Sequence, residues 1–89
     1  MQDQVDQYKS DTYISLYYKN FNSIGIRQKK DDKDPKKNGP QLFSFGRGTH
    51  LSEIRLRNYG AQVLKRLDKG EEIEDVKRWV GTEMAKYKA

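Results

Sequence analysis

The chain contains no cysteine and a single histidine, His50. Without thiols it cannot form a disulfide, a thiolate metal site or a cysteine nucleophile. A lone histidine, with Glu53 as the carboxylate near it in the sequence, supplies neither the three or four ligands of a metal site nor a nucleophile–base pair. We therefore predict a protein that is not an enzyme, with no catalytic residue, no metal site and no cofactor.

Long hydrophobic runs are also missing. No apolar segment approaches the roughly 18–20 residues that cross a bilayer, and hydrophobic residues make up only 34% of the 89 residues. The lack of cysteine fits a reducing compartment. These features predict a cytoplasmic protein without a membrane partner. They also predict a thin core, for which homodimer formation is a common way to bury more surface.

Positive charge is concentrated in the middle of the chain. Residues 23–70 contain 12 Lys or Arg against 5 Asp or Glu, whereas residues 1–22 and 71–89 are each slightly acidic. A positive field on one folded module favours a polyanionic partner, and nucleic acid is the commonest such partner. The same pattern does not distinguish DNA from RNA, since that depends on contacts to the 2′-hydroxyl.

Patterns of alternation and helical periodicity predict an α+β fold. Strands are expected at 12–18, 24–29 and 41–45, with a polar turn that makes the first two an antiparallel hairpin. Two amphipathic helices follow, one that begins between Thr49 and Ser52 and ends at Gly70, and one over 71–87. We therefore predict a small antiparallel sheet of three or four strands followed by two helices.

The remaining segments complete a single domain over residues 11–89. Residues 1–10 lack apolar periodicity, which predicts a flexible tail. Residues 30–40 contain charged and turn-forming residues without a hydrophobic side chain, which predicts a mobile loop within the domain. Its aspartates alternate with lysines, so a solvated loop is favoured over a calcium site.

The outward face of the first two strands is the leading candidate for a binding surface. Alternation turns Ile14, Leu16 and Tyr18 toward the core. The opposite positions combine aromatic rings with positive charge: Tyr13, Tyr17, Lys19, Arg27 and Lys29. Rings stack on unpaired bases while cations follow phosphates, as in single-strand binders of low selectivity. The alternative is that these tyrosines are simply good strand residues on a face that packs against the helices.

Two further features extend this candidate surface. Gly46-Arg47-Gly48 precedes the first predicted helix, where Arg47 and free backbone N–H groups would favour a phosphate. A turn that merely needs glycine dihedrals explains the same residues. Arg55 lies on the basic side of that helix and either contacts a nucleic-acid backbone or keeps the helix soluble.

The second predicted helix carries an apolar stripe with two aromatic side chains. Its residues are candidates for an interface: Val76, Trp79, Val80 and Tyr87. Aromatic residues are enriched at interface centres, and packing within the chain is the alternative. The stripe therefore leaves open a second functional class, a phage- or plasmid-type interaction module that inhibits or adapts a host enzyme. A third is a ribonucleoprotein subunit whose charged loop orders on assembly.

A family resemblance supports the first class. Ile24-Gly25-Ile26-Arg27, a charged loop with Asp34-Pro35, and the run from Phe45 to Glu53 resemble the single-stranded-DNA-binding transcriptional coactivator (positive cofactor) family over about residues 12–68. The resemblance implies a curved antiparallel sheet, a helix-mediated homodimer, and sheet residues that bind melted or single-stranded DNA. The matched elements are Arg27, Arg47 and the helix entry at Leu51-Ser52.

Overall fold

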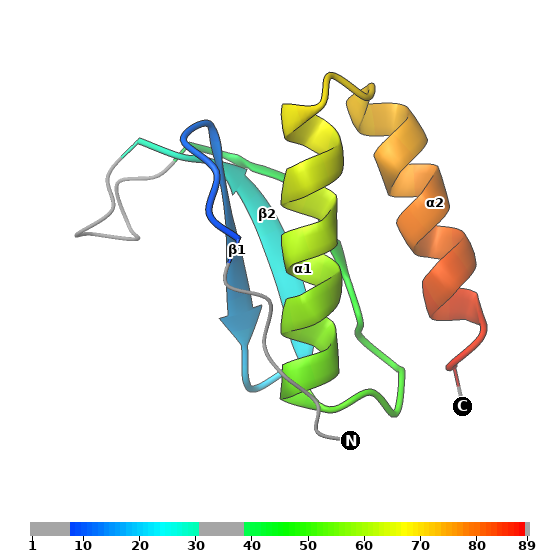
Figure 1. Cartoon of the computed structure of the whole chain (residues 1–89). Helices are drawn as coiled ribbons and strands as arrows, with labels where there is room; N and C mark the ends of the chain where they lie inside the picture. Colours follow the sequence, from blue (N-terminus) through cyan, green and yellow to red (C-terminus); the bar gives the residue numbers. More distant parts are fainter. Residues whose placement is uncertain (1–7, 31–38, 89) are drawn as a thin grey trace.

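The computed structural model describes residues 8–30 and 39–88, which form an antiparallel sheet followed by two helices (Figure 1). Within these residues the sheet has three strands in the order β1-β2-β3. The elements are β1 (Tyr13–Tyr18), β2 (Ser23–Gln28), β3 (Gln41–Phe45), α1 (Glu53–Asp68) and α2 (Ile73–Ala85). The predicted α+β fold is confirmed.

Most of the predicted tail (1–10) and of the predicted mobile loop (30–40) lies outside the described residues. Ser10, at the end of the tail, is buried. Its Oγ donates a hydrogen bond to Asp68 Oδ1 at 2.8 Å and accepts the backbone N–H groups of Thr12 and Tyr13, each at 3.0 Å. The chain is therefore fixed to the C-terminal end of α1 before β1 begins.

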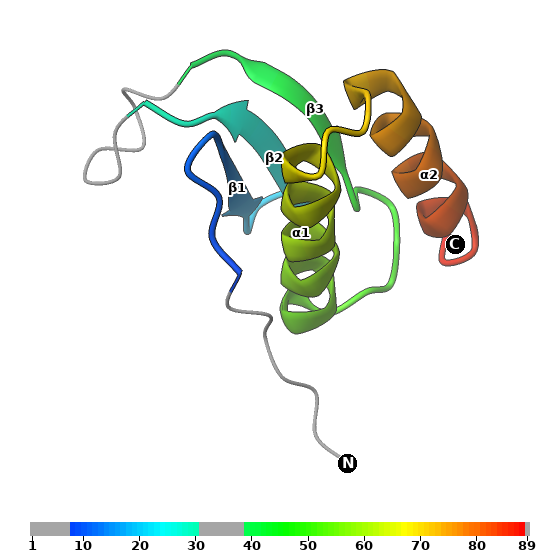
Figure 2. The ribbon, with the colours of Figure 1, turned by 45° about the horizontal axis from the view of Figure 1, so that its top comes forward.

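Both helices lie on the same side of the sheet (Figures 1 and 2). α1 packs against β1 and β2, while α2 lies beside α1 and against β3. No helix in the described part of the chain covers the opposite side of the sheet. We call that side the open face.

The turn between β1 and β2 sets their register. Asn22 has a left-handed backbone (φ 49°), a conformation that asparagine tolerates better than most residues. It places Tyr18 opposite Ser23 and Tyr13 opposite Gln28 in the antiparallel ladder. The Asn22 side chain accepts a hydrogen bond from Tyr17 Oη at 2.7 Å and donates one to the Leu51 carbonyl at 2.9 Å. The hairpin is thus attached to the segment that leads into α1.

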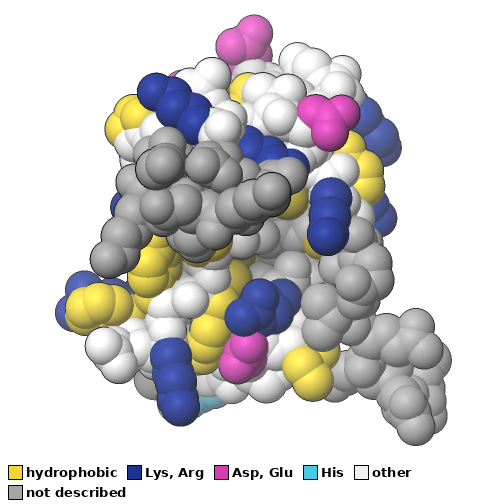
Figure 3. Space-filling view, turned by 90° about the vertical axis from the view of Figure 1, so that its left-hand side faces the viewer, with side chains coloured by type: hydrophobic (Ala, Val, Ile, Leu, Met, Phe, Trp, Pro, Cys, Tyr) yellow, Lys and Arg dark blue, Asp and Glu magenta, His cyan; other side chains and the backbone are white. Residues whose placement is uncertain are grey.

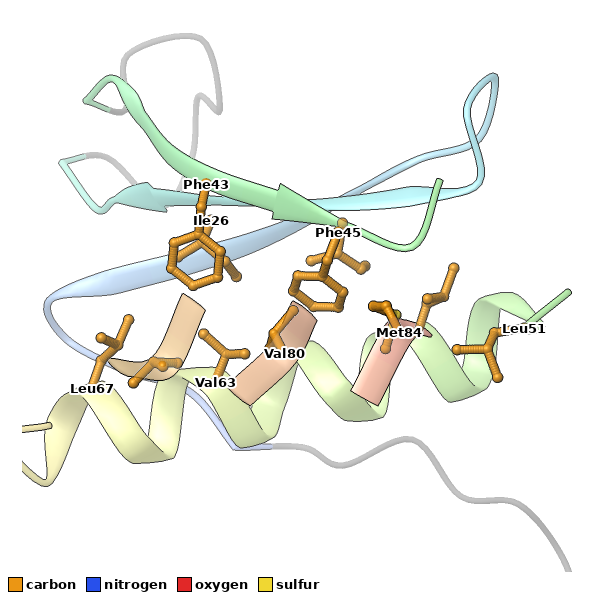
Figure 4. Packing of buried hydrophobic residues seen from close by; sticks show 11 residues of the cluster. Ile26, Phe43, Phe45, Leu51, Val63, Leu67, Val80 and Met84 are labelled. Atoms are coloured by element: carbon orange, nitrogen blue, oxygen red, sulfur yellow. The ribbon is translucent and has the colours of Figure 1, made fainter. Parts of the chain in front are cut away.

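One hydrophobic core fills the space between the sheet and the helices (Figure 4). Apolar side chains from β2 and β3 point toward those of both helices. The contributing residues are Ile24, Ile26, Phe43 and Phe45 from the sheet, Leu56, Val63 and Leu67 from α1, and Val76, Val80 and Met84 from α2. Leu51, between β3 and α1, closes one end. Burial of this shared layer holds the two helices on the sheet.

The helix ends agree with the sequence signals. Ser52 caps α1, because its Oγ accepts the Arg55 backbone N–H at 3.3 Å. Gly70 follows α1 with a left-handed φ of +95°, and its N–H donates to the Leu67 carbonyl at 3.0 Å. Within residues 8–30 and 39–88, neither helix is long and apolar enough to cross a membrane.

We predict that Ile26→Ala lowers the free energy of unfolding by about 2–5 kcal/mol, because it leaves a cavity in the core. Ile26 is 0% exposed, whereas Ile54 is 41% exposed on α1. The same truncation at Ile54 should change stability by only about 0.5 kcal/mol or less. Urea denaturation followed by tryptophan fluorescence measures both. Equal losses in the two variants would contradict the position of the core.

Candidate nucleic-acid interface

The two faces of β1 are the reverse of those predicted. Tyr17 lies directly opposite Ile24, which is 1% exposed, and opposed residues of an antiparallel pair share a face. Tyr13 and Tyr17 both pack against the core. The prediction that they face outward with Arg27 is therefore wrong. The alternation pattern could not decide which face of β1 meets the core, because apolar side chains occupy both faces of the strand. Pairing with β2 turns the two tyrosines toward the helices.

The open face consequently carries Ile14, Leu16 and Tyr18 from β1. Their partners in the ladder are Arg27, Gly25 and Ser23 of β2, respectively. Arg27 thus lies on the outward face, as predicted. The three β1 side chains are half-buried. On the side of the molecule that is on the left in Figure 1, hydrophobic side chains lie among those of Lys and Arg (Figure 3).

A shallow pocket of about 270 Å³ on the open face brings aromatic and basic residues together. Two aromatic rings, two guanidinium groups and three uncharged polar side chains surround it: Tyr18, Phe21, Arg27, Arg47, Ser23, Gln41 and Ser44. None of these described residues carries a carboxylate. We call this site the open-face pocket. It combines groups that stack on a planar ring with groups that bind an anion.

The two arginines reach the pocket from different elements. On β2, Arg27 Nε donates to Tyr18 Oη at 3.3 Å and Arg27 Nη1 donates to the Gly39 carbonyl at 3.2 Å. Both acceptors are neutral, so the positive charge of Arg27 is not compensated there. The Arg47 guanidinium lies 4.9 Å from the centre of the Phe21 ring, in a cation–π contact. That contact links the segment after β3 to the β1–β2 turn.

Gly25 lies beneath two of the lining side chains, those of Tyr18 and Gln41. A Cβ at this position would lie 2.7 Å from Gln41 Oε1 and 2.7 Å from Tyr18 Cε2. Such distances are too short for real atoms, so both side chains would have to move. The missing side chain of Gly25 is what lets Tyr18 and Gln41 lie across the middle strand.

The other predicted binding residues lie elsewhere. Lys19 is exposed in the turn after β1 and does not line the open-face pocket. Lys29 Nζ donates to the Ser10 carbonyl at 3.2 Å, close to the N-terminal segment. The Arg55 guanidinium lies 5.5 Å from the centre of the Tyr87 ring, on the helical side. Of the predicted set, Arg27 and Arg47 therefore line the open-face pocket, whereas Tyr13 and Lys29 line a separate pocket of about 310 Å³ beside Ser10.

Sequence reasoning missed Phe21, although a signal for it was present. Phe21 occupies a polar turn between Asn20 and Asn22, where a large apolar side chain has little to pack against. The structure leaves it 53% exposed. An aromatic residue in a hairpin turn is therefore informative when the neighbouring strands carry arginine.

The Gly46-Arg47-Gly48 segment forms a tight turn and does not itself start the helix. Gly46 and Gly48 have φ values of +101° and +83°. Thr49 Oγ1 donates to the Gly46 carbonyl at 2.6 Å, which closes the turn. Because α1 begins at Glu53, the turn is separated from the helix N-terminus. The glycines therefore serve the turn, the alternative explanation raised by the sequence, while Arg47 remains available on its surface.

The candidate interface residues of α2 are engaged within the chain. Val76 and Val80 are 0% and 2% exposed. The Trp79 ring lies 6.1 Å from the Tyr59 ring and 4.1 Å from the Arg66 guanidinium, both on α1. These contacts explain the apolar stripe without a second copy of the chain. The homodimer and the protein partner stay predictions.

Tyr59 lies at the centre of the contact between α1 and α2. Its hydroxyl donates to Glu83 Oε1 at 3.2 Å, and Tyr87 lies close by. Burial, followed by hydrogen bonding with Tyr87 and the nearby Glu83 carboxylate, raises the pKa of Tyr59 far above its usual value. The neutral phenol is thus the form that the folded protein holds.

No group of side chains that could hold a metal ion accompanies these contacts in the described ranges. Residues 8–30 and 39–88 contain no cluster of three His, Asp or Glu side chains that would hold a metal ion. His50 is exposed, and its backbone N–H donates to the Tyr87 carbonyl at 3.3 Å.

Comparison with known proteins adds no relative. No protein-family model, no curated protein and no solved structure matches this chain. The resemblance to the single-stranded-DNA-binding coactivators therefore stays an expectation from sequence motifs. Support for the candidate site therefore comes from its geometry and not from a relative.

We predict that the wild-type protein loses stability above about pH 10, the usual pKa of tyrosine, more steeply than Tyr59→Phe does. A raised pKa in the folded state means that stability is fully present below the unfolded-state pKa and is lost as the pH rises through the folded-state pKa. Urea denaturation at neutral and alkaline pH tests this. Parallel losses in both proteins would show that Tyr59 does not contribute.

Proposed function

We propose that this chain is a non-enzymatic protein that binds single-stranded nucleic acid at the open-face pocket. The observation that carries the proposal is the meeting of Tyr18, Phe21, Arg27 and Arg47 on the face of the sheet without helices, with no carboxylate among the described lining residues. Rings and guanidinium groups are the two components that single-strand binders combine.

The size and shape of the pocket favour an unpaired base as the ligand. Its volume of about 270 Å³ falls just below the roughly 300–1,000 Å³ typical of sites for drug-sized ligands. An exposed base can stack on the half-exposed Phe21 ring, whereas a base inside a duplex is already stacked on its neighbours. Stacking tolerates every base, so sequence selectivity should be low.

Uncompensated charge supports the same ligand. Arginines on the outer helix surfaces form ion pairs, as Arg57 does with Glu53 at 2.7 Å and Arg66 with Glu71 at 3.2 Å. Arg27 and Arg47 form none with any carboxylate that the structure describes. Cations without a carboxylate partner are free to contact phosphates, and each such contact releases counterions from the strand.

We predict that Arg27→Ala and Arg47→Ala each weaken binding to oligothymidine and lower the slope of log K against log salt concentration by about 0.7. Fluorescence anisotropy with a labelled strand at several salt concentrations measures both quantities. Arg78→Ala is the matched control, since it removes the same charge from an exposed ion pair with Asp75 on α2.

Wild-type protein should bind a single strand more tightly than the matched duplex. The proposal would be abandoned if neither oligonucleotide binds at low salt. In that case the interaction-module hypothesis takes precedence, and the exposed edges of Trp79 and Tyr87 become the surface to mutate.

We predict that Phe21→Ala weakens binding of the same strand roughly 5- to 150-fold, because one stacked base contributes about 1–3 kcal/mol. Ile54→Ala provides the control, since Ile54 is the other large hydrophobic residue exposed in the described chain. It lies outside the pocket, so its truncation should leave the affinity unchanged. Loss of affinity in both variants would argue for nonspecific adhesion.

A further inference from the structure

A second groove lies on the other side of β3, between that strand and α2. It has a volume of about 230 Å³ and an apolar floor that includes Phe45, Val80 and Met84. Three cationic side chains line it: Arg47, Lys77 and Lys88. None of the described lining residues carries a carboxylate. We call it the edge groove.

The edge groove and the open-face pocket are neighbours across β3. Arg47 and Ser44 line both of them. β3 is an edge strand of the described sheet, so no further strand of the described residues separates the two sites. A ligand that leaves the open-face pocket past Arg47 therefore enters the edge groove directly.

The cations of α2 and of the residues after it are of two kinds, those that form an ion pair and those that do not. Arg78 lies 3.4 Å from Asp75, and Lys86 lies 2.9 Å from Glu83, both outside the groove. Lys77 and Lys88 line the groove, and neither forms an ion pair with a carboxylate in the described part of the chain. The uncompensated charge is thus on the side that faces β3.

The helix surface between these two lysines is open. Gly81 lines the groove, and a Cβ added to it would have no atom within 4 Å. A glycine inside a helix costs about 1 kcal/mol relative to alanine. Lys88 is positioned by an antiparallel β-bridge with Thr49. An unobstructed floor bordered by positive charge suits an extended, negatively charged backbone.

We propose that a bound single strand continues from the open-face pocket past Arg47, around the edge of β3, and into the edge groove, where Lys77 and Lys88 contact its phosphates. The inference rests on the proposed function and extends it, because it defines the path of the strand. The apolar floor accommodates the sugars or bases of the nucleotides that follow the one at Phe21.

The contributions of the two sites to binding can be distinguished with oligothymidines of increasing length. Suitable lengths run from about 4 to about 16 nucleotides, the site sizes found in single-strand binders. The double variant Lys77→Ala/Lys88→Ala should match wild type on the shortest strand and lose affinity on longer ones. Its salt slope on long strands should fall by about 1.4, from two contacts at about 0.7 each. The control Lys69→Ala/Arg78→Ala removes the same net charge outside both sites and should behave as wild type.

Gly81→Glu provides an independent variant, because it adds a negative side chain at an open helix position without loss of a contact. It should weaken binding of long strands more than Gly81→Gln does. The proposed path is overturned if wild type and Lys77→Ala/Lys88→Ala bind every length equally while Arg27→Ala binds weakly, a result that leaves the proposed function intact. If wild type binds no strand at any length, the proposed function fails and the path with it.

Discussion

The rest of the structure depends on β2, the middle strand, because it pairs with both neighbours and supplies the most deeply buried side chains of the sheet. Ile24 and Ile26 are 1% and 0% exposed and belong to the core between the sheet and the helices, where β2 packs against α1. The Asn22 turn fixes how β1 aligns with this strand, and that alignment brings the Tyr13 and Tyr17 rings to the core. The same register places Ile14, Leu16 and Tyr18 on the open face.

The opposite side of β2 explains the open-face pocket. There the strand presents Ser23, Gly25 and Arg27, two small residues and one cation. Because Gly25 has no side chain, Tyr18 and Gln41 lie across it, while Ser23 and Arg27 line the pocket itself. Tyr18, Phe21 and Arg47 complete the lining from neighbouring elements, so the core and the candidate site lie on opposite faces of the same strand.

Sequence patterns predicted the elements of the fold well. Alternation and turn chemistry located the strands, and helical periodicity with the Ser52 cap and Gly70 located the first helix. Each of these signals is local, and the structure agrees with them. The face of β1 was not predictable in this way, since alternation favoured Ile14 and Leu16 for the core, whereas pairing with β2 turns Tyr13 and Tyr17 toward it.

The candidate site was only half predictable for a related reason. Arg27 and Arg47 could be selected from charge and turn patterns. Their meeting with Tyr18 and Phe21 depends on strand register and on the return of the chain after β3. Such proximity is a property of tertiary structure, and no spacing in a single sequence encodes it.

The attachment of the hairpin turn to the rest of the molecule has a consequence for the energetics of recognition. Asn22 connects the turn both to Tyr17 and to the Leu51 carbonyl, and Arg47 rests on the neighbouring Phe21 ring. A ring carried on an anchored turn leaves only its own torsions to be ordered by a ligand, and ordering one flexible side chain costs about 0.5–1.5 kcal/mol. For the proposed ligand, the turn would therefore add little backbone ordering to the cost of binding.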